Sequence, residues 1–255
     1  MFAMPTRFLL LSIDGILLMV ICKVLTFGHD FSKGPIKDGC RKITIKIAYH
    51  IACTFFLFVT GMWTSVHHDD VDYSYYLGNN YKKEEKVGKR TSTYVSNHVS
   101  WLDPIIMIKC VRPAFSPEAG FKNIPLFNTL IDCLDSIYIP RGGTDASKAR
   151  ALEEIRTRQE LIEETGKYSP FLIFAEAGTS NGTSIIKFKK GAFFAEKRVR
   201  PIYMKHSNGT VNAGFEVMEF LPLTILQLSW CCMTCSVHVL PDFQPNEFFF
   251  KKHAK

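Results

Sequence analysis

The sequence lacks the features of a polytopic transporter, of a disulfide-stabilised domain and of a disordered chain. Its mean hydropathy of +0.04 is too low for a protein made mainly of membrane-spanning helices, although it does not exclude one or two such helices. Its eight cysteines follow no regular spacing, so we expect reduced, buried thiols and no disulfide framework. Because 47% of its 255 residues are apolar, the chain has enough material for a packed core, which excludes intrinsic disorder.

Acidic residues are outnumbered by basic ones, with 24 Asp and Glu against 31 Lys and Arg, for a formal charge of +7. Together with 21 Phe, this excess suits an anionic lipid surface. Nucleic-acid binding would also use positive charge, but the aromatic residues sit in apolar runs, so we expect no nucleic-acid partner. Cys232, Cys235 and His238 could be half of a zinc site, but a second ligand pair is missing from the sequence, and we expect no metal.

Two apolar segments set the beginning of the chain apart from the rest. Residues 8–27 are apolar apart from two charges, and residues 47–64 contain no charged residue over 18 positions. A hydrocarbon layer of about 30 Å needs about 20 helical residues, so these lengths predict a helical pair that spans or dips into a membrane. The alternative is a pair of core helices in a soluble protein. We therefore predict a membrane-associated segment at 1–66 and an α/β domain at 67–255.

Beyond the apolar segments, short strands alternate with helices. Strands are predicted at residues 92–96, 136–140, 171–174, 199–204 and 236–240. Helices are predicted from Asp103 onward and at residues 121–134, 145–166 and 220–232. Such alternation is typical of an α/β fold in which helices flank a mostly parallel sheet.

The residues most suited to chemistry follow the first predicted strand of this domain. His98 lies in the loop after the strand, and Asp103 follows five residues later at a helix start. A carboxylate in that position can hold one ring N–H of the imidazole, so that the other nitrogen accepts a proton. The sequence has no Gly-x-Ser-x-Gly motif for an enzyme nucleophile, so His98 is predicted to activate a substrate hydroxyl. On spacing alone, a structural His–Asp pair is the alternative.

Two further loops follow strands and carry groups that attract anions. Arg141 precedes two glycines, a setting in which a guanidinium can bind a phosphate through two hydrogen bonds. Residues 174–182 form a loop of small residues with one carboxylate, Glu176, and Lys187 lies shortly after it. Small residues let a backbone approach a ligand closely. Each loop alone could be an ordinary surface loop, but three loops at three strand ends indicate one site.

In these loops the sequence resembles the phospholipid and glycerol acyltransferases, over roughly residues 90–245. Asn97-His98-x4-Asp103 matches the first motif of that family, and the stretch that ends in Arg141 resembles the second. Residues 176–182 stand where the family has a Pro-Glu-Gly-Thr loop, and Pro201 lies in a stretch that resembles the fourth motif. Residues 186–193 are most similar to the lysophosphatidylcholine acyltransferase branch.

The resemblance implies an enzyme that moves an acyl chain from acyl-CoA, or from acyl carrier protein, to the hydroxyl of a lysophospholipid or glycerophosphate. It implies that His98 is the general base and that Asp103 orients it. The residues implied in binding the acceptor phosphate are Arg141, Glu176, Gly178, Thr179 and Lys187. Asn97 and Pro201 would be structural or lie beside the acyl chain. The resemblance implies no metal and no bound cofactor, with acyl-CoA as co-substrate and with a bilayer and a lysophospholipid as partners.

The third motif departs from the family pattern, because Ala175-Glu176-Ala177-Gly178 stands in place of Pro-Glu-Gly-Thr. A methyl group at position 177 removes backbone conformations that glycine allows. This departure, and a chain that ends soon after the last predicted strand, keep an alternative open. The alternative is an acyltransferase-like fold retained as a non-catalytic or impaired subunit of a larger membrane complex, for example a mitochondrial respiratory complex. For either function we expect a membrane location, in the endoplasmic reticulum or the mitochondrial inner membrane.

Overall fold

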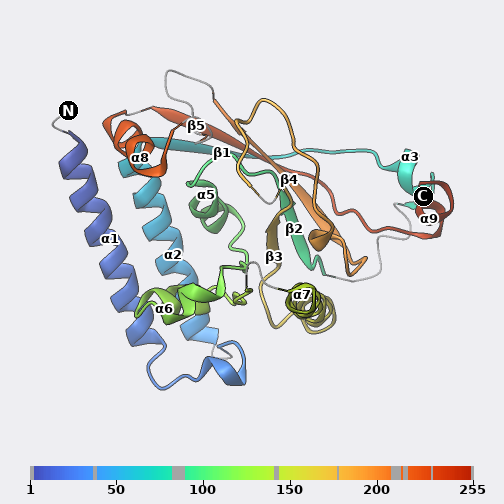
Figure 1. Ribbon diagram of the computed structural model, residues 1–255, viewed down its shortest axis with the longest axis horizontal. Coiled ribbons are helices and arrows are strands. Elements are labelled where there is room, and N and C mark those ends of the chain that lie inside the picture. Colours follow the sequence, from blue (N-terminus) through green and yellow to red (C-terminus); the bar gives the residue numbers. More distant parts are fainter. Residues whose placement is uncertain are drawn as a thin grey trace.

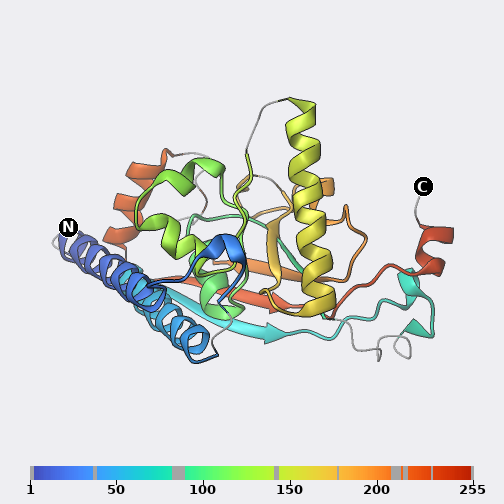
Figure 2. The ribbon, with the colours of Figure 1, turned by 90° about the horizontal axis from the view of Figure 1, so that it is seen from below.

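Five strands form one mixed sheet, and helices flank it (Figures 1 and 2). The computed structural model describes residues 3–36, 39–81, 90–140, 144–176, 178–207, 214, 218–230 and 232–253. The strands are β1 (Met62–His68), β2 (Thr93–Ser96), β3 (Phe171–Phe174), β4 (Val199–His206) and β5 (Met233–Val239). They lie in the order β1-β5-β4-β2-β3. The β4–β5 pairing is antiparallel and the other three pairings are parallel, which confirms the predicted mostly parallel α/β sheet.

The helices are distributed unevenly around this sheet. α1 (Ala3–Leu25) and α2 (Gly39–Thr60) run side by side at one end of the molecule, while the short helices α3 (Ser74–Leu77) and α9 (Glu247–Lys252) lie at the opposite end (Figure 1). The remaining helices are α5 (Asp103–Cys110), α6 (Phe127–Asp132), α7 (Asp145–Thr165) and α8 (Phe220–Ser229). Short 3-10 turns lie at Phe31–Lys33, Ala119–Asn123 and Lys190–Ala192.

Two elements match their sequence signals closely. β3 spans the predicted residues 171–174, an apolar run of the kind that buried parallel strands carry. α7 begins after Thr144, whose hydroxyl oxygen accepts a hydrogen bond from the Ser147 N–H at 3.4 Å. It ends at Gly166, which has a φ of +58°, a conformation that favours glycine over other residues. Both ends of α7 therefore follow from capping residues that are visible in the sequence.

The predicted helix at residues 121–134 is wrong in its extent, because the 3-10 turn Ala119–Asn123 and the short helix α6 take its place. The break falls at Pro125. A proline has no backbone N–H and disfavours helical conformation in the residue before it. Ile124 is accordingly extended, with a φ of −87° and a ψ of 110°.

The predicted strand at residues 136–140 is also wrong, because the structure reduces it to a single bridge between Ile139 and Glu118. Ile137 and Ile139 donate their N–H groups to the carbonyls of Phe115 and Pro117. Pro117 has no N–H with which to bond the carbonyl of Ile137 in return, so a second bridge cannot form.

The second apolar segment ends earlier than its composition predicts. α2 ends at Thr60, Gly61 takes a positive φ of 76°, and β1 begins at Met62. β1 pairs with β5 along its whole length, so the end of the predicted span at 47–64 belongs to the sheet. β1 extends from Met62 to His68 and so contains the predicted boundary after residue 66. The division into a membrane-associated segment at 1–66 and an α/β domain at 67–255 stays a prediction.

α1 and α2 are the candidate membrane spans among the described helices, by length and composition. In the apolar window of α2, 39% of the residues are buried inside the molecule, whereas in that of α1 only 11% are. The exposed apolar side chains of α1 include Phe8, Leu9, Ile13, Ile16, Leu17, Val20 and Val24. An apolar surface of this length needs a cover of lipid or protein.

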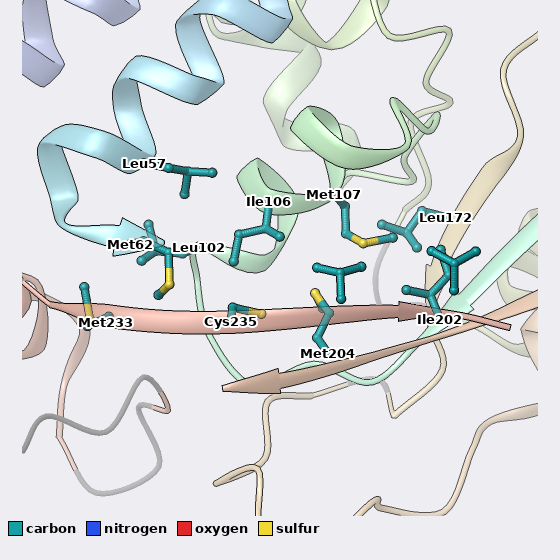
Figure 3. Close-up of a cluster of buried hydrophobic side chains, with 12 residues drawn as sticks. Leu57, Met62, Leu102, Ile106, Met107, Leu172, Ile202, Met204, Met233 and Cys235 are labelled. Atoms are coloured by element: carbon teal, nitrogen blue, oxygen red, sulfur yellow. The ribbon is translucent and has the colours of Figure 1, made fainter. Parts of the chain in front are cut away.

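The main hydrophobic core lies between α5, the end of α2 and one face of the sheet (Figure 3). Its twelve buried residues come from segments far apart in the sequence: Leu57, Met62, Leu102, Ile106, Met107, Leu172, Ile202, Met204, Met233, Cys235, Val237 and Val239. Leu102 and Ile106 are fully buried and lie at the start of α5. The core therefore fixes the position of the loop that joins β2 to α5.

We predict that Leu172→Ala lowers the free energy of unfolding by about 2–4 kcal/mol, because Leu172 is 2% exposed and its removal leaves a cavity in the main core. Thermal or denaturant unfolding of the purified protein measures this loss. The matched control is Leu161→Ala on α7, where the side chain is 37% exposed and the expected loss is below about 1 kcal/mol. Equal losses in the two variants would contradict the packing described here.

Candidate active site

The candidate site is built on the loop that leaves the carboxyl end of β2. Asn97 begins this loop and is almost fully buried. Its side-chain amide donates to the Met204 carbonyl at 2.9 Å, and its side-chain oxygen accepts from the Met204 N–H at 2.8 Å. These two bonds tie the end of β2 to β4. Asn97 therefore fixes the start of the loop that carries the next residue, His98.

The structure brings His98 and Asp103 together as the sequence predicts. The Nδ1 atom of His98 lies 2.9 Å from Oδ2 of Asp103. The same oxygen accepts hydrogen bonds from the backbone N–H groups of Val99 at 2.7 Å and Ser100 at 2.9 Å. Because a carboxylate only accepts, the proton in the His98 contact sits on Nδ1. That tautomer leaves Nε2 as the nitrogen that can take a proton from another molecule.

Asp103 is a buried anion that stays ionised at neutral pH. Its side chain is fully buried, and burial alone would raise the pKa of its carboxyl group. Hydrogen bonds and charge from His206 and His98 outweigh burial, so the pKa of Asp103 falls from its usual 3.8 to about 2. The negative charge is therefore available to hold the His98 ring and to stabilise it when it is protonated.

The His98 side chain is partly accessible, at 20% exposure, whereas its partner carboxylate is not. The ring stacks on Phe174 at the end of β3, with centroids 4.1 Å apart and an angle of 15° between the planes. Asp103 and Phe174 together fix the ring in two directions. An oriented and partly accessible imidazole with one nitrogen paired is suited to general base catalysis.

A second His–Asp pair in the molecule lacks these properties. Nδ1 of His238 on β5 lies 2.8 Å from Oδ2 of Asp69, a geometry close to that of the first pair. The Asp69 side chain, however, is 41% exposed, so water screens its charge. Distance alone does not distinguish the two pairs, whereas burial of the carboxylate does.

The loop of the third motif holds the peptide group of His98. Glu176 is 4% exposed, and its Oε2 accepts the His98 N–H at 2.7 Å while its Oε1 accepts the Ile186 N–H at 2.7 Å. Ser180 donates its N–H to the His98 carbonyl at 2.8 Å. Both oxygens of Glu176 are thus bonded to backbone, which gives this residue a positioning role. Its predicted contact with an acceptor phosphate stays a prediction.

The remaining predicted residues occupy different places. Gly178 and Lys187 are exposed and Thr179 is half-buried, in the segment that follows Glu176. Pro201 lies in β4 opposite Val95 of β2, one residue before the paired stretch of β4 and β5 begins. Its carbonyl accepts the Leu240 N–H at 3.0 Å, but a proline has no N–H to donate in return, so the β4–β5 ladder ends at this position. Arg141 lies outside the described residues.

The sequence analysis missed one residue of the site, His206. It is the last residue of β4, and its Nε2 lies 2.7 Å from Oδ1 of Asp103. The signal was the alternation of β4, in which Ile202 and Met204 face the core and a third inward position falls on His206. Nothing local in the sequence connects this position to Asp103, which lies 103 residues away.

Aromatic contacts connect the site loop to the apolar helices. The indole N–H of Trp101 donates to Oε1 of Gln227 on α8 at 2.7 Å. The Trp101 ring meets Phe56 of α2 and Phe220 of α8 edge to face, at centroid distances of 6.1 and 5.7 Å. The loop that carries His98 therefore lies directly beside α2 and α8.

We predict a specific pH dependence of stability from Asp103. Because its folded-state pKa of about 2 lies below 3.8, ionised Asp103 stabilises the fold by about 2 kcal/mol above pH 4, and this is lost as the pH falls towards 2. Asp103→Asn lacks this contribution, so its unfolding temperature should depend less on pH in that window. Asp69→Asn, at the exposed pair, is the control and should keep the wild-type dependence. Parallel curves for all three proteins would show that Asp103 is not a buried anion.

Comparison with known proteins identifies the family. A family model described as Acyltransferase matches residues 79–205, a range that contains His98, Asp103 and Glu176. The lysophospholipid acyltransferase LPCAT4 of Mus musculus is 30% identical over 151 residues, which are 58% of this chain and 28% of that protein. The lysophospholipid acyltransferase LPEAT1 of Arabidopsis thaliana is 24% identical over 270 aligned residues, covering 95% of this chain and 68% of that protein. The match thus spans less than a third of the LPCAT4 protein.

A solved structure shows the same fold. The 1-acyl-sn-glycerophosphate acyltransferase PlsC from Thermotoga maritima superposes with a TM-score of 0.50 and 17% sequence identity, over 95% of this chain and 92% of that one. The resemblance predicted from the motifs is confirmed. The chain belongs to the phospholipid and glycerolipid acyltransferase family, and within it is similar to the lysophosphatidylcholine acyltransferases.

Proposed function

We propose that this protein is a membrane-bound enzyme that transfers an acyl chain from acyl-CoA to the hydroxyl of a lysophospholipid or glycerophosphate. The observation that carries the proposal is a partly accessible imidazole, His98, oriented by a fully buried and ionised carboxylate, Asp103. Such a pair is suited to removing a proton from an alcohol. The relatives named above act on lysophospholipids according to their names, which supports the same class of acceptor here.

In the proposed reaction, Nε2 of His98 takes the proton of the acceptor hydroxyl while the hydroxyl oxygen attacks the thioester carbonyl of acyl-CoA. The new bond is an ester C–O bond, and the bond that breaks is the C–S bond of the thioester. The CoA thiolate that leaves recovers the proton from the His98 imidazolium. Asp103 stabilises that imidazolium between the two proton transfers and remains ionised throughout.

The acceptor phosphate is assigned to the residues that the sequence motifs suggested. Lys187 and Gly178 are exposed in the segment after Glu176, where a bound anion could reach them. Arg141 remains the proposed bidentate partner of the phosphate. Glu176 has a positioning role in the proposed site, because its carboxylate accepts the backbone N–H of His98.

The alternative of a non-catalytic subunit of a larger membrane complex is not favoured by these observations. The matched relatives are named as acyltransferases. A scaffold would also have no need for a fully buried carboxylate beside a partly accessible imidazole, because burying a charge opposes folding unless it is well paired.

Membrane attachment is proposed to come from α1 and α2, whose outer surfaces are apolar over most of their length. The predicted membranes are the endoplasmic reticulum and the mitochondrial inner membrane. A lipid acceptor and an acyl chain both partition to the bilayer, so attachment keeps the site where its substrates concentrate.

We predict that His98→Ala lowers kcat by about 10²- to 10⁴-fold, because the variant has no group to accept the hydroxyl proton. Purified protein is assayed with acyl-CoA and a panel of lysophospholipids and glycerol 3-phosphate. The matched control is His238→Ala, which removes the imidazole of the exposed His–Asp pair and should change kcat by less than about twofold. Equal turnover in wild-type protein and His98→Ala would exclude His98 as the base.

A second prediction tests the membrane surface. The double variant Leu17→Arg with Ile51→Arg places one charge on the exposed face of each apolar helix, where each costs about 3 kcal/mol in a bilayer. The variant should leave phosphatidylcholine vesicles and appear in the soluble fraction of a flotation gradient. Leu161→Arg, a charge on the exposed side of α7, should float with the vesicles as wild type does. Flotation of the double variant at wild-type levels would contradict attachment through α1 and α2.

A further inference from the structure

A second imidazole is buried behind the proposed catalytic pair. His206 ends β4 and faces the main core, where the alternation of the strand would otherwise place an apolar side chain. Its side chain is 2% exposed, so it cannot contact a substrate in solution. A buried polar ring in such a place is retained only when a specific partner offsets the loss of water.

The partner of His206 is the carboxylate that orients His98. Nε2 of His206 lies 2.7 Å from Oδ1 of Asp103, and Nδ1 of His98 lies 2.9 Å from Oδ2. Asp103 thus lies between two imidazoles, one on each oxygen. With the N–H groups of Val99 and Ser100, the carboxylate accepts four hydrogen bonds among the described residues. The imidazoles of His98 and His206 differ in exposure by a factor of ten.

The hydrogen bonds assign the proton of His206. A carboxylate oxygen accepts, so Nε2 donates its proton to Asp103. Nδ1 is buried without a hydrogen-bond partner in the part of the chain that the structure describes. A proton there would create a buried N–H with no acceptor, which is costly, whereas a bare nitrogen is tolerated more easily. We therefore place the proton that His206 shares with Asp103 on Nε2.

The other titratable groups around His206 contribute little charge. Cys235 of β5 places its sulfur 3.8 Å from Nε2 of His206, and burial, followed by the negative charge of Asp103, raises the pKa of its thiol. Burial likewise raises the pKa of Cys110 on α5, against the opposing effect of Lys109. Glu176 reaches the network only through the backbone N–H of His98. The charge that acts on the buried side of His98 is therefore the negative charge of Asp103. The groups that donate hydrogen bonds to Asp103 reduce that charge.

We propose that His206 is a positioning residue for the transfer reaction, which holds Asp103 through its Nε2–H and limits the negative charge that Asp103 offers to His98. The inference rests on the proposed function, because the role of His98 as a base gives this control its purpose. Each donor to a carboxylate withdraws part of its charge and lowers its ability to stabilise a neighbouring cation. With His206 in place, Asp103 has less negative charge with which to stabilise a protonated His98 ring, so the unprotonated form that acts as a base is favoured.

Two substitutions at position 206 separate this role from simple packing. His206→Leu has a similar volume and removes the donor, whereas His206→Gln keeps an N–H at the end of a side chain of similar reach. Ile202→Val is the control for packing, since it trims a buried side chain on the same face of β4 without touching Asp103. His206→Leu is expected to lower the unfolding temperature most, because it leaves Oδ1 of the buried Asp103 without its donor, whereas His206→Gln and Ile202→Val should lower it only slightly. Only the loss of the donor is expected to change the pH dependence.

The first readout is the pH profile of acyl transfer. In His206→Leu the acidic limb of the kcat profile should move upward by about half a pH unit or more, and kcat at pH 6 should fall by about threefold to tenfold. The KM for the acceptor should stay within about twofold of wild type, because His206 does not reach the substrate. His206→Gln and Ile202→Val should keep the wild-type limb. A wild-type limb in His206→Leu, or equal shifts in the Leu and Gln variants, would overturn the inference.

The second readout needs no turnover. The His98 ring can be titrated by NMR in histidine-labelled protein, with its signal assigned through His98→Gln. The midpoint should rise in His206→Leu and stay in place in His206→Gln and Ile202→Val. If wild-type protein transfers no acyl chain but the midpoint still rises, the proposed function fails while the coupling of His206 to His98 holds. An unchanged midpoint in His206→Leu would overturn the coupling itself, whatever the activity.

Discussion

The buried carboxylate of Asp103 is the group on which the rest of the site depends. An ion of this kind costs several kcal/mol to remove from water, so it is stable only when nearby donors replace the lost hydration. Its donors come from two separate parts of the chain: His98, Val99 and Ser100 from the loop after β2, and His206 from the end of β4. The site therefore forms only when β4 has paired beside β2. The loop supplies three of the four donors and β4 supplies the fourth, so pairing of β4 beside β2 completes the solvation of the anion.

The altered third motif is compatible with this arrangement. Glu176, which the motif shares with the family, is the residue whose oxygens hold the backbone of His98 and Ile186. Ala175 stands where the family has proline, and its N–H donates to the carbonyl of Ser96 at 3.2 Å, a bond that proline could not make. Its side chain is 1% exposed. The change at this position therefore adds a contact between the ends of β3 and β2 and leaves the support of His98 in place.

The parts of the site that the sequence predicts are those that depend on neighbouring residues. His98 and Asp103 are five residues apart, so a loop and the first turn of a helix are enough to bring them together. The ends of α7 follow in the same way from Thr144 and Gly166. His206 could not be found like this, because its contact with Asp103 follows from the order of strands in the sheet. The β1 strand was missed for a related reason. The apolar composition of its first residues indicates burial but not the type of element, and only the pairing with β5 makes this segment a strand.

The position of the site beside the apolar helices bears on how a lipid reaches it. Trp101, three residues after His98, packs against Phe56 of α2 and bonds to Gln227 of α8. Arg7, near the start of α1, in turn donates hydrogen bonds to the carbonyls of Leu228 and Trp230 at the end of α8. The loop that carries His98 is thus supported by helices whose outer faces are apolar. Under the proposed function, a lipid acceptor that inserts its acyl chain beside these helices would meet the loop of His98 at the same end of the molecule, so chain insertion would also help to bring the reacting groups together.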